Sequence, residues 1–308
     1  MANFKLTTPV AFIIFNRPDT TERVFAEIAK AKPPKLLVIA DGPRFAKQGE
    51  AEMCAQTRSI VDRIDWDCEV LTNFSEVNLG CGERISSGIE WVFKNVSEAI
   101  ILEDDCLPSQ SFFIYCDQML NMYRNDKRIF SISGSNFSNE DELYGHYFSR
   151  YSLMWGWATW ADRWSLYEFE PNDQFRVIFH TWWKNPLVFI YWTLIFRKLH
   201  KINTWDYQWI LTLWRYGALS CRPSRNLVKN IGFRDDATHT TNVNYHLSLT
   251  TFYNKNTFFN SPLTNLLPNR FLEKQDEKKW ARLGRSILIN LFPFLIKMKA
   301  VLREIIKK

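Results

Sequence analysis

Three consecutive acids, Glu103, Asp104 and Asp105, directly follow the apolar run at residues 99–102. Such a run favours a strand that is buried on both faces, as in a parallel α/β sheet, where ligands bind at the carboxyl ends of the strands. Three carboxylates at one strand end repel one another unless a cation joins them. A Mg²⁺ or Mn²⁺ ion that holds a diphosphate is one explanation. The alternative is that Asp105 caps a helix near Pro108 and the other two acids face solvent.

The elements around this cluster alternate between strand and helix patterns over the first 135 residues. Strands are predicted at residues 9–15, 35–40, 68–72, 99–102 and 128–132, and helices at 19–31, 47–64, 83–95 and 109–124. This alternation favours βαβ units and a parallel sheet. We therefore expect an α/β fold with a Rossmann-like, mostly parallel sheet flanked by helices.

The second half of the chain is rich in tryptophan. Residues 155–214 hold ten of the 13 tryptophans, and residues 188–199 and 209–214 have helical patterns. Core packing is the favoured role for most of these rings. A few could instead stack on the C–H faces of sugar rings.

The composition indicates a folded chain, because 46% of its residues are hydrophobic and 16% are aromatic. The six cysteines form no CxxC pair and no zinc-like spacing, so we expect reduced thiols in a cytoplasmic protein. Residues 269–308 carry 11 Lys and Arg against 4 Asp and Glu, whereas the rest carries 28 against 29. A near-neutral body argues against a nucleic-acid partner.

The basic tail contains a mostly apolar run, residues 286–298, that Pro293 interrupts. The run is shorter than the ~20 residues that span a bilayer. Flanking charges such as Arg285 and Lys297 are typical of a helix on an anionic membrane surface, which would place the protein on the inner face of the membrane. A helix packed on the body with a solvated basic face explains the pattern equally well. We expect residues 254–308 to form a linker and a basic amphipathic tail.

Five landmarks, in this order, resemble the nucleotide-sugar glycosyltransferases of the GT-A fold. The chain is most similar to the N-acetylglucosaminyltransferase I type and more distantly to the bacterial inverting glycosyltransferases. The landmarks are Phe15-Asn16-Arg17, Ile39-Ala40-Asp41-Gly42, Glu83-Arg84 with Trp91-Val92-Phe93, Ile101-Leu102-Glu103-Asp104-Asp105, and Gly156-Trp157 with Trp164 and Trp205-Asp206. The resemblance implies a glycosyltransferase domain at residues 1–253, with a nucleotide-binding half at 1–135 and an acceptor-binding half at 136–253.

The resemblance implies donor-binding roles for three residues outside the acid cluster. Arg17 would approach the diphosphate or the base, Asp41 would accept the uracil N–H, and Arg84 would bind phosphate. The alternatives are a surface Arg beside a proline turn, an Asp-Gly turn, and an ordinary Arg on a helix surface.

Within the acid cluster, the resemblance implies that Glu103 and Asp104 orient the base and the ribose. Asp105 would ligate the Mn²⁺ or Mg²⁺ that bridges both phosphates and neutralises the charge on the leaving nucleoside diphosphate. Residues 233–239 match a loop that closes over the donor, so His239 would touch phosphate or metal. A structural role for this single histidine is the alternative.

An inverting transfer needs a carboxylate that accepts the proton of the attacking acceptor hydroxyl. The resemblance implies that this base is Asp206. The family has two adjacent Asp residues here and uses the second as the base, whereas this chain has Asp206 followed by Tyr207.

These features together predict a metal-dependent inverting glycosyltransferase. It would move a sugar from a UDP-sugar such as UDP-GlcNAc to a glycan or a lipid-linked acceptor. A sugar-phosphate nucleotidyltransferase is one alternative, although such enzymes normally carry a Gly-rich loop that residues 15–18 lack. A non-catalytic membrane-associated binding protein on a degenerate transferase fold is the other.

Overall fold

The computed structural model describes residues 4–137, 145–198, 202–232, 267–269, 273–278 and 281. The chain forms two compact units. The first comprises Met1–Glu170 with Asn203–Asn269, and the second comprises Pro171–Ile202 with Arg270–Lys308. The second unit thus interrupts the region that we predicted as the acceptor-binding half. The domain limits at residues 135 and 253 stay predictions, and most of the predicted tail lies outside the described residues.

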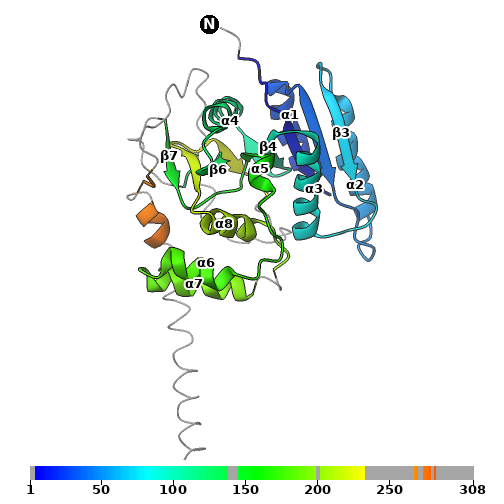
Figure 1. Ribbon diagram of the computed structural model, residues 1–308. Coiled ribbons are helices and arrows are strands. Elements are labelled where there is room, and N and C mark those ends of the chain that lie inside the picture. Colours follow the sequence, from blue (N-terminus) through cyan, green and yellow to red (C-terminus); the bar gives the residue numbers. More distant parts are fainter. Residues whose placement is uncertain are drawn as a thin grey trace, which may run out of the picture. The chain divides into compact units, whose positions relative to one another are not determined.

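The first unit is built around an eight-stranded mixed sheet with helices packed against it, a Rossmann-like arrangement (Figure 1). The strand order is β3-β2-β1-β4-β8-β6-β9-β7. The bounds are β1 Val10–Ile14, β2 Lys35–Ala40, β3 Glu69–Phe74, β4 Glu98–Glu103, β6 Ile129–Ser133, β7 His146–Ser149, β8 Trp157–Trp160 and β9 Leu219–Pro223, with β5 Cys106–Pro108 and β10 Val228–Asn230 in a separate pair.

The predicted parallel βαβ half is confirmed. Strands β1 to β4 pair in parallel, and β1 and β4 are buried along almost their whole length because helices cover both faces of the sheet. The helices of this unit are α1 Pro18–Ala31, α2 Glu50–Ser59, the short 3₁₀ helix η1 Ile60–Arg63, α3 Cys81–Asn95, α4 Gln110–Tyr123, α5 Ala161–Trp164 and α8 Asp206–Arg215. The helix cap that we considered for Asp105 is wrong, since Ser109 precedes α4 and residues 106–108 form a short strand.

Strand β8 is the main departure from the predicted sheet. It runs antiparallel between β4 and β6, with Trp157 opposite both Ile101 and Ser133. This orientation puts the start of β8 beside the end of β4. The sequence of β8 gave no strand prediction, because its pairing depends on two strands that are distant along the chain.

Most of the tryptophans of the first unit have the predicted core role. Trp157, Trp164, Trp205 and Trp209 are buried and form a cluster in which Trp157 and Trp205 stack with ring centroids 5.5 Å apart. Their burial leaves no open ring face for a sugar at these four positions. All six cysteines are unpaired thiols.

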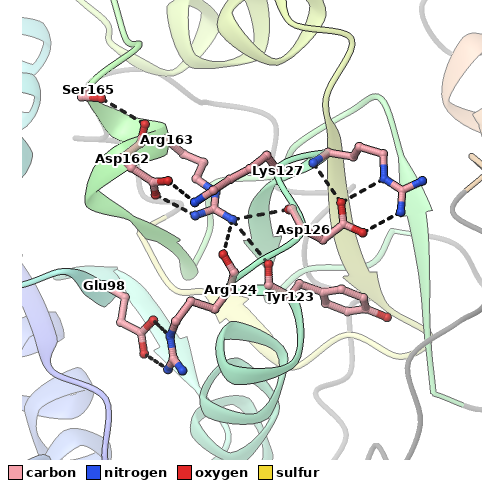
Figure 2. A network of polar contacts seen from close by, with 9 residues as sticks. Glu98, Tyr123, Arg124, Asp126, Lys127, Asp162, Arg163 and Ser165 are labelled. Carbon is pink, nitrogen blue, oxygen red and sulfur yellow. Dashed lines mark hydrogen bonds and ion pairs between the residues drawn. The ribbon is translucent and has the colours of Figure 1, made fainter.

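A polar network joins the end of α4 to α5 (Figure 2). Arg163 on α5 donates to the backbone carbonyls at the end of α4, and its guanidinium also pairs with Asp162 at 2.6 Å. Near the start of β4, Glu98 forms an ion pair with Arg124 at 2.8 Å. These contacts tie the start of β4 and the helix α5 to one helix end.

The second unit contains the helix pair α6 Gln174–Trp182 and α7 Pro186–Arg197, which run side by side (Figure 1). Further helical residues lie at 273–278 and 281. Within the described part of the chain, no helix has both the length and the apolar character that crossing a membrane requires. The apolar run 286–298 and the predicted membrane role of the tail lie outside the described residues.

Candidate functional site

The carboxyl ends of β1, β2 and β4 lie at one edge of the sheet, because these strands are parallel neighbours. Arg17 lies in the turn after β1, Asp41 follows β2, and Glu103 is the last residue of β4. The fold therefore collects three predicted donor-binding residues, from segments far apart in the sequence, at the edge where α/β sheets bind ligands.

Arg17 links the two aspartates of the acid cluster. Its guanidinium forms an ion pair with Asp104 and a second one with Asp105 Oδ2 at 3.0 Å. Asp104 is buried and also accepts the Phe15 N–H at 3.2 Å. Burial raises the pKa of Asp104 to about 6 despite the opposing charge of Arg17. The guanidinium thus neutralises part of the cluster, and its contact with a diphosphate or base stays a prediction.

Glu103 differs from Asp104 and Asp105 in its side-chain contacts. Its carboxylate has no hydrogen bond or ion pair within the described residues. Burial raises the pKa of Glu103 to about 8, and the charges of Asp105 and Asp104 add to this rise. A partly buried carboxylate with a raised pKa favours a cation or a hydrogen-bond donor from a ligand. Its predicted role toward base or ribose stays a prediction.

Asp105 packs against the backbone of residues 231–232. The Ile231 N–H donates to the Asp105 carbonyl at 2.8 Å, and a Cβ on Gly232 would lie 2.2 Å from Asp105 Oδ2. The close approach therefore requires glycine at position 232. Residues 233–239 follow directly in the sequence and lie outside the described residues. The role that we predicted for His239 therefore stays a prediction.

Asp41 organises the loop that leads into α3. Its Oδ1 accepts the N–H groups of Gly42 and Leu79, each at 2.9 Å. Its Oδ2 accepts the Asn78 amide at 2.9 Å and the Gly80 N–H at 3.0 Å. A carboxylate offers about four acceptor sites, so the protein uses them all. A uracil contact would have to exchange one of these bonds, and it stays a prediction.

Arg84 is also engaged with the protein. Its Nε donates to the Ala40 carbonyl at 3.1 Å and its Nη2 donates to Asn73 Oδ1 at 2.6 Å. Burial lowers the pKa of Arg84. The exposed helix-surface alternative is therefore wrong, because this Arg ties α3 to the ends of β2 and β3. Phosphate binding by Arg84 stays a prediction.

Sequence reasoning missed a buried acid at the same edge. Glu50 accepts the Asn16 amide at 2.8 Å and the Arg44 N–H at 2.7 Å, and it forms an ion pair with the Arg44 guanidinium. These contacts join the turn after β1 to the loop after β2. The helical pattern of residues 47–64 carries no signal for this role, because the partners come from outside the helix.

Asp206 is the first residue of α8, and its Oδ1 accepts the Tyr207 N–H at 2.9 Å and the Thr204 hydroxyl. Burial raises the pKa of Tyr207 to about 12, and the charge of Asp206 adds to this rise. The same charge also contributes to the raised pKa of Glu103. The structure therefore brings Asp206 into the electrostatic neighbourhood of the acid cluster, whereas its role as base stays a prediction.

The segment before Asp206 packs directly on the first turn of α3. Gly82 donates its N–H to Asn203 Oδ1 at 2.8 Å. A Cβ on Gly80 or Gly82 would lie 2.3 or 2.9 Å from the Asn203 side chain, and Gly80 also has a φ of +80°. Two glycines within residues 78–82 are the sequence signal that could have identified this contact.

Among the described residues, a metal would find few protein ligands at this edge. In the part of the chain that the structure describes, no group of three or more His, Cys, Asp or Glu could hold a metal ion. Glu103 and Asp105 are the two candidate carboxylates. Mg²⁺ is commonly held by one or two carboxylates together with substrate phosphates. The residues present therefore fit a cation shared with a diphosphate.

Comparisons with known proteins give no family for this chain. No protein-family model matches it, and no curated protein matches its sequence. Among solved structures, it is similar to a cytidylyltransferase from Leptospira borgpetersenii serovar Hardjo-bovis at 10% identity, to a UDP-glucose pyrophosphorylase in complex with UDP-glucose at 8%, and to 4-diphosphocytidyl-2C-methyl-D-erythritol synthase from Anaerococcus prevotii at 9%.

Each of these likenesses is weak and partial. The TM-score is 0.31 in all three, the matches cover 53, 52 and 52% of this chain, and they span 63, 78 and 73% of the other chains. The cytidylyltransferase belongs by name to the nucleotidyltransferase class, which is the alternative stated above to glycosyl transfer. Similarity at this level does not establish a shared activity.

Proposed function

We propose that this protein is an enzyme that binds a nucleotide sugar and transfers the sugar to an acceptor hydroxyl. The observation that carries the proposal is that Glu103 and Asp105 lie at the carboxyl end of β4, with Glu103 unpartnered within the described residues, and that the charge of Asp206, at the start of α8, contributes to the raised pKa of Glu103. Transfer from a nucleoside diphosphate needs positive charge at the diphosphate and a carboxylate at the acceptor. One group of acids at the strand ends and one acid on a separate helix can divide these tasks.

In this proposal Asp105 and Glu103 hold a divalent cation together with the donor diphosphate. The bound cation supplies charge stabilisation to the leaving nucleoside diphosphate. Arg17 keeps Asp104 and Asp105 in place and reduces their mutual repulsion. The choice of uridine, and of Mn²⁺ or Mg²⁺, rests on the resemblance described above.

Asp206 accepts the proton of the acceptor hydroxyl in this proposal. The Thr204 hydroxyl and the Tyr207 N–H both bond to Oδ1, which fixes the orientation of the carboxylate. Asn203 accepts the Gly82 N–H and so holds the segment before Asp206 against α3. A base that is held on a helix end is positioned without a loop rearrangement.

The turn between β1 and α1 favours glycosyl transfer over nucleotidyl transfer. Gly-rich loops hold a triphosphate through several backbone N–H groups. Here α1 begins at Pro18, which has no N–H, and the guanidinium of Arg17 is paired with two acids. The turn therefore has neither the glycines nor a freely available cation for this task.

Calorimetry tests the binding part of the proposal. UDP should bind in the presence of Mn²⁺ and lose most of its affinity in EDTA. Equal affinity for UDP with and without EDTA would contradict the shared cation.

Product analysis tests the reaction. Release of UDP from UDP-sugars, without release of pyrophosphate from UTP and a sugar phosphate, supports glycosyl transfer. The opposite result would assign nucleotidyl transfer. Binding of UDP with neither product would indicate a binding protein without catalysis.

A further inference from the structure

We propose that the second unit docks on an anionic lipid surface through one face of α6. The division of the chain into units separates its charge. Residues 171–202 and 270–308 carry 16 Lys and Arg against 5 Asp and Glu, and the remainder carries 23 against 28. The whole positive excess therefore belongs to the second unit, whose two segments are far apart in the sequence.

Helix α6 and its C-cap residue Trp183 carry a row of exposed aromatic side chains. Phe175, Phe179 and Trp183 are 60, 48 and 59% exposed, and their spacing of four residues places them on one face. Phe175 and Phe179 both lie edge-on to Phe189 of α7, with ring centroids 5.7 and 6.0 Å away. Val177, on another side of the helix, is buried. Grouped exposed aromatics of this kind mark an interaction surface.

A cationic row lies beside the aromatic row. Arg176, His180 and Lys184 each follow one aromatic residue and are exposed. The Lys184 ammonium lies 5.2 Å from the centroid of the Trp183 ring. Two acids lie near this row: Asp173 pairs with Arg176 at 3.1 Å, and Glu277 accepts the side-chain amide of Asn185, the residue after Lys184, at 3.2 Å. From residue 174 to 205 the sequence contains five Lys and Arg and no Asp or Glu.

An anionic bilayer surface matches both rows. Aromatic rings settle at the level of the lipid headgroups, and each nearby Lys or Arg adds about 1 kcal/mol of attraction to anionic lipid. A second copy of the chain fits less well, because it would bring two cationic rows together. Since α6 has 9 residues and α7 has 12, both would lie on the surface without spanning it.

Co-sedimentation of the full-length chain with vesicles tests the proposal. Vesicles of phosphatidylcholine alone are compared with vesicles that also contain phosphatidylglycerol, at low and high salt. The unmodified chain should bind the anionic vesicles, and high salt should weaken binding. The triple variant Phe175→Ser, Phe179→Ser, Trp183→Ser and the double variant Arg176→Glu, Lys184→Glu should each bind at least tenfold more weakly.

Matched variants in the first unit control for general effects. Phe45 is fully exposed, and Lys30 and Lys94 have side chains that are 62 and 68% exposed. Phe45→Ser, and the pair Lys30→Glu with Lys94→Glu, should bind vesicles like the unmodified chain. Circular dichroism of every variant confirms that it is folded, and sensitivity to the α6 changes alone supports the proposal.

Three results would overturn the proposal. The α6 variants could bind like the unmodified chain, which would assign binding to the tail. The unmodified chain could fail to bind anionic vesicles. The triple variant could bind vesicles normally but show a changed oligomeric state in sedimentation velocity. That result would make the aromatic row a contact between copies of the chain. The Trp183→Phe variant adds a direct readout. Brominated lipid should quench a smaller fraction of the tryptophan fluorescence in this variant than in the unmodified chain.

Discussion

Replacing Arg163 by Met should destabilise the first unit by about 3 kcal/mol. The Arg163 side chain is 2% exposed and donates to the Arg124 carbonyl at 2.6 Å, and at 3.4 Å to the carbonyls of Tyr123 and Asp126 (Figure 2). The Tyr123 and Asp126 carbonyls also accept the N–H groups of Asp126 and Ile129, at 3.0 and 3.1 Å, so the short bond to the Arg124 carbonyl is the main contribution of Arg163 at this helix end. The substitution therefore removes the charged donor from the Arg124 carbonyl, just beyond the end of α4.

The magnitude follows from three contributions. The short bond from a charged donor is worth about 1.5–3 kcal/mol. A positive charge at a helix carboxyl end adds about 0.3–2 kcal/mol. The guanidinium also lies 4.2 Å from the centroid of the Trp160 ring, a contact worth about 0.5–2 kcal/mol. Apolar packing of Met offsets part of the loss, and Arg163→Lys should cost roughly half as much because it keeps the charge but loses the fork of donors.

Urea unfolding followed by tryptophan fluorescence measures the change in the free energy of unfolding. Arg128→Met is the matched control, because Arg128 pairs with Asp126 of the same turn at 2.7 Å but its side chain is 69% exposed. That variant should cost less than about 1 kcal/mol. If Arg163→Met costs no more than Arg128→Met, the capping of α4 by Arg163 is refuted.

Three further predictions concern the candidate site, and one concerns a buried histidine. Asp206→Asn should keep UDP affinity and lower turnover about a hundredfold or more in steady-state kinetics, because the amide cannot accept a proton; near-native turnover would move the base elsewhere. Asp105→Asn should instead weaken UDP binding with Mn²⁺ in calorimetry, since it alters the ground-state complex. Asp41→Asn should cost about 1–3 kcal/mol in urea unfolding, because an amide nitrogen then faces N–H donors; unchanged stability would contradict the role in the loop. Burial lowers the pKa of His146 from 6.5 to about 4, so the unfolded chain binds the extra proton between these values. Stability should be complete above pH 6.5 and fall by at most roughly 3 kcal/mol on acidification to pH 4, and His146→Gln should flatten this slope.

Local sequence patterns were sufficient for the parallel half of the sheet. The apolar runs at residues 9–15, 35–40 and 99–102 became β1, β2 and β4, and each predicted helix between them formed within a few residues of its expected bounds. Each of these elements buries one or both of its faces. Burial alone therefore sets the spacing of apolar residues along consecutive positions. The same reasoning placed Arg17, Asp41 and the acid cluster at the carboxyl ends of neighbouring strands.

The partners of these residues were beyond the reach of sequence. Nothing in the local pattern shows that Asp41 would accept four hydrogen bonds from residues 42 and 78–80. Nor does it show that Arg17 would pair with Asp104 and Asp105. The burial of Arg84 is equally absent from it. Hydrogen bonds and ion pairs depend on which segments meet in space, and no spacing along the chain encodes that.

Residue types and apolar runs were enough to predict which residues could do chemistry and which strand ends would carry them. The tertiary structure decided which of them remain available to a ligand: Glu103 is left without a protein partner among the described residues, whereas Asp41 and Arg84 are committed to the fold. It also decided that the cationic segment 171–202 and the basic tail belong to one unit. The physical reason is the same in each case, since residue type sets what a side chain can do, and long-range packing sets what it meets.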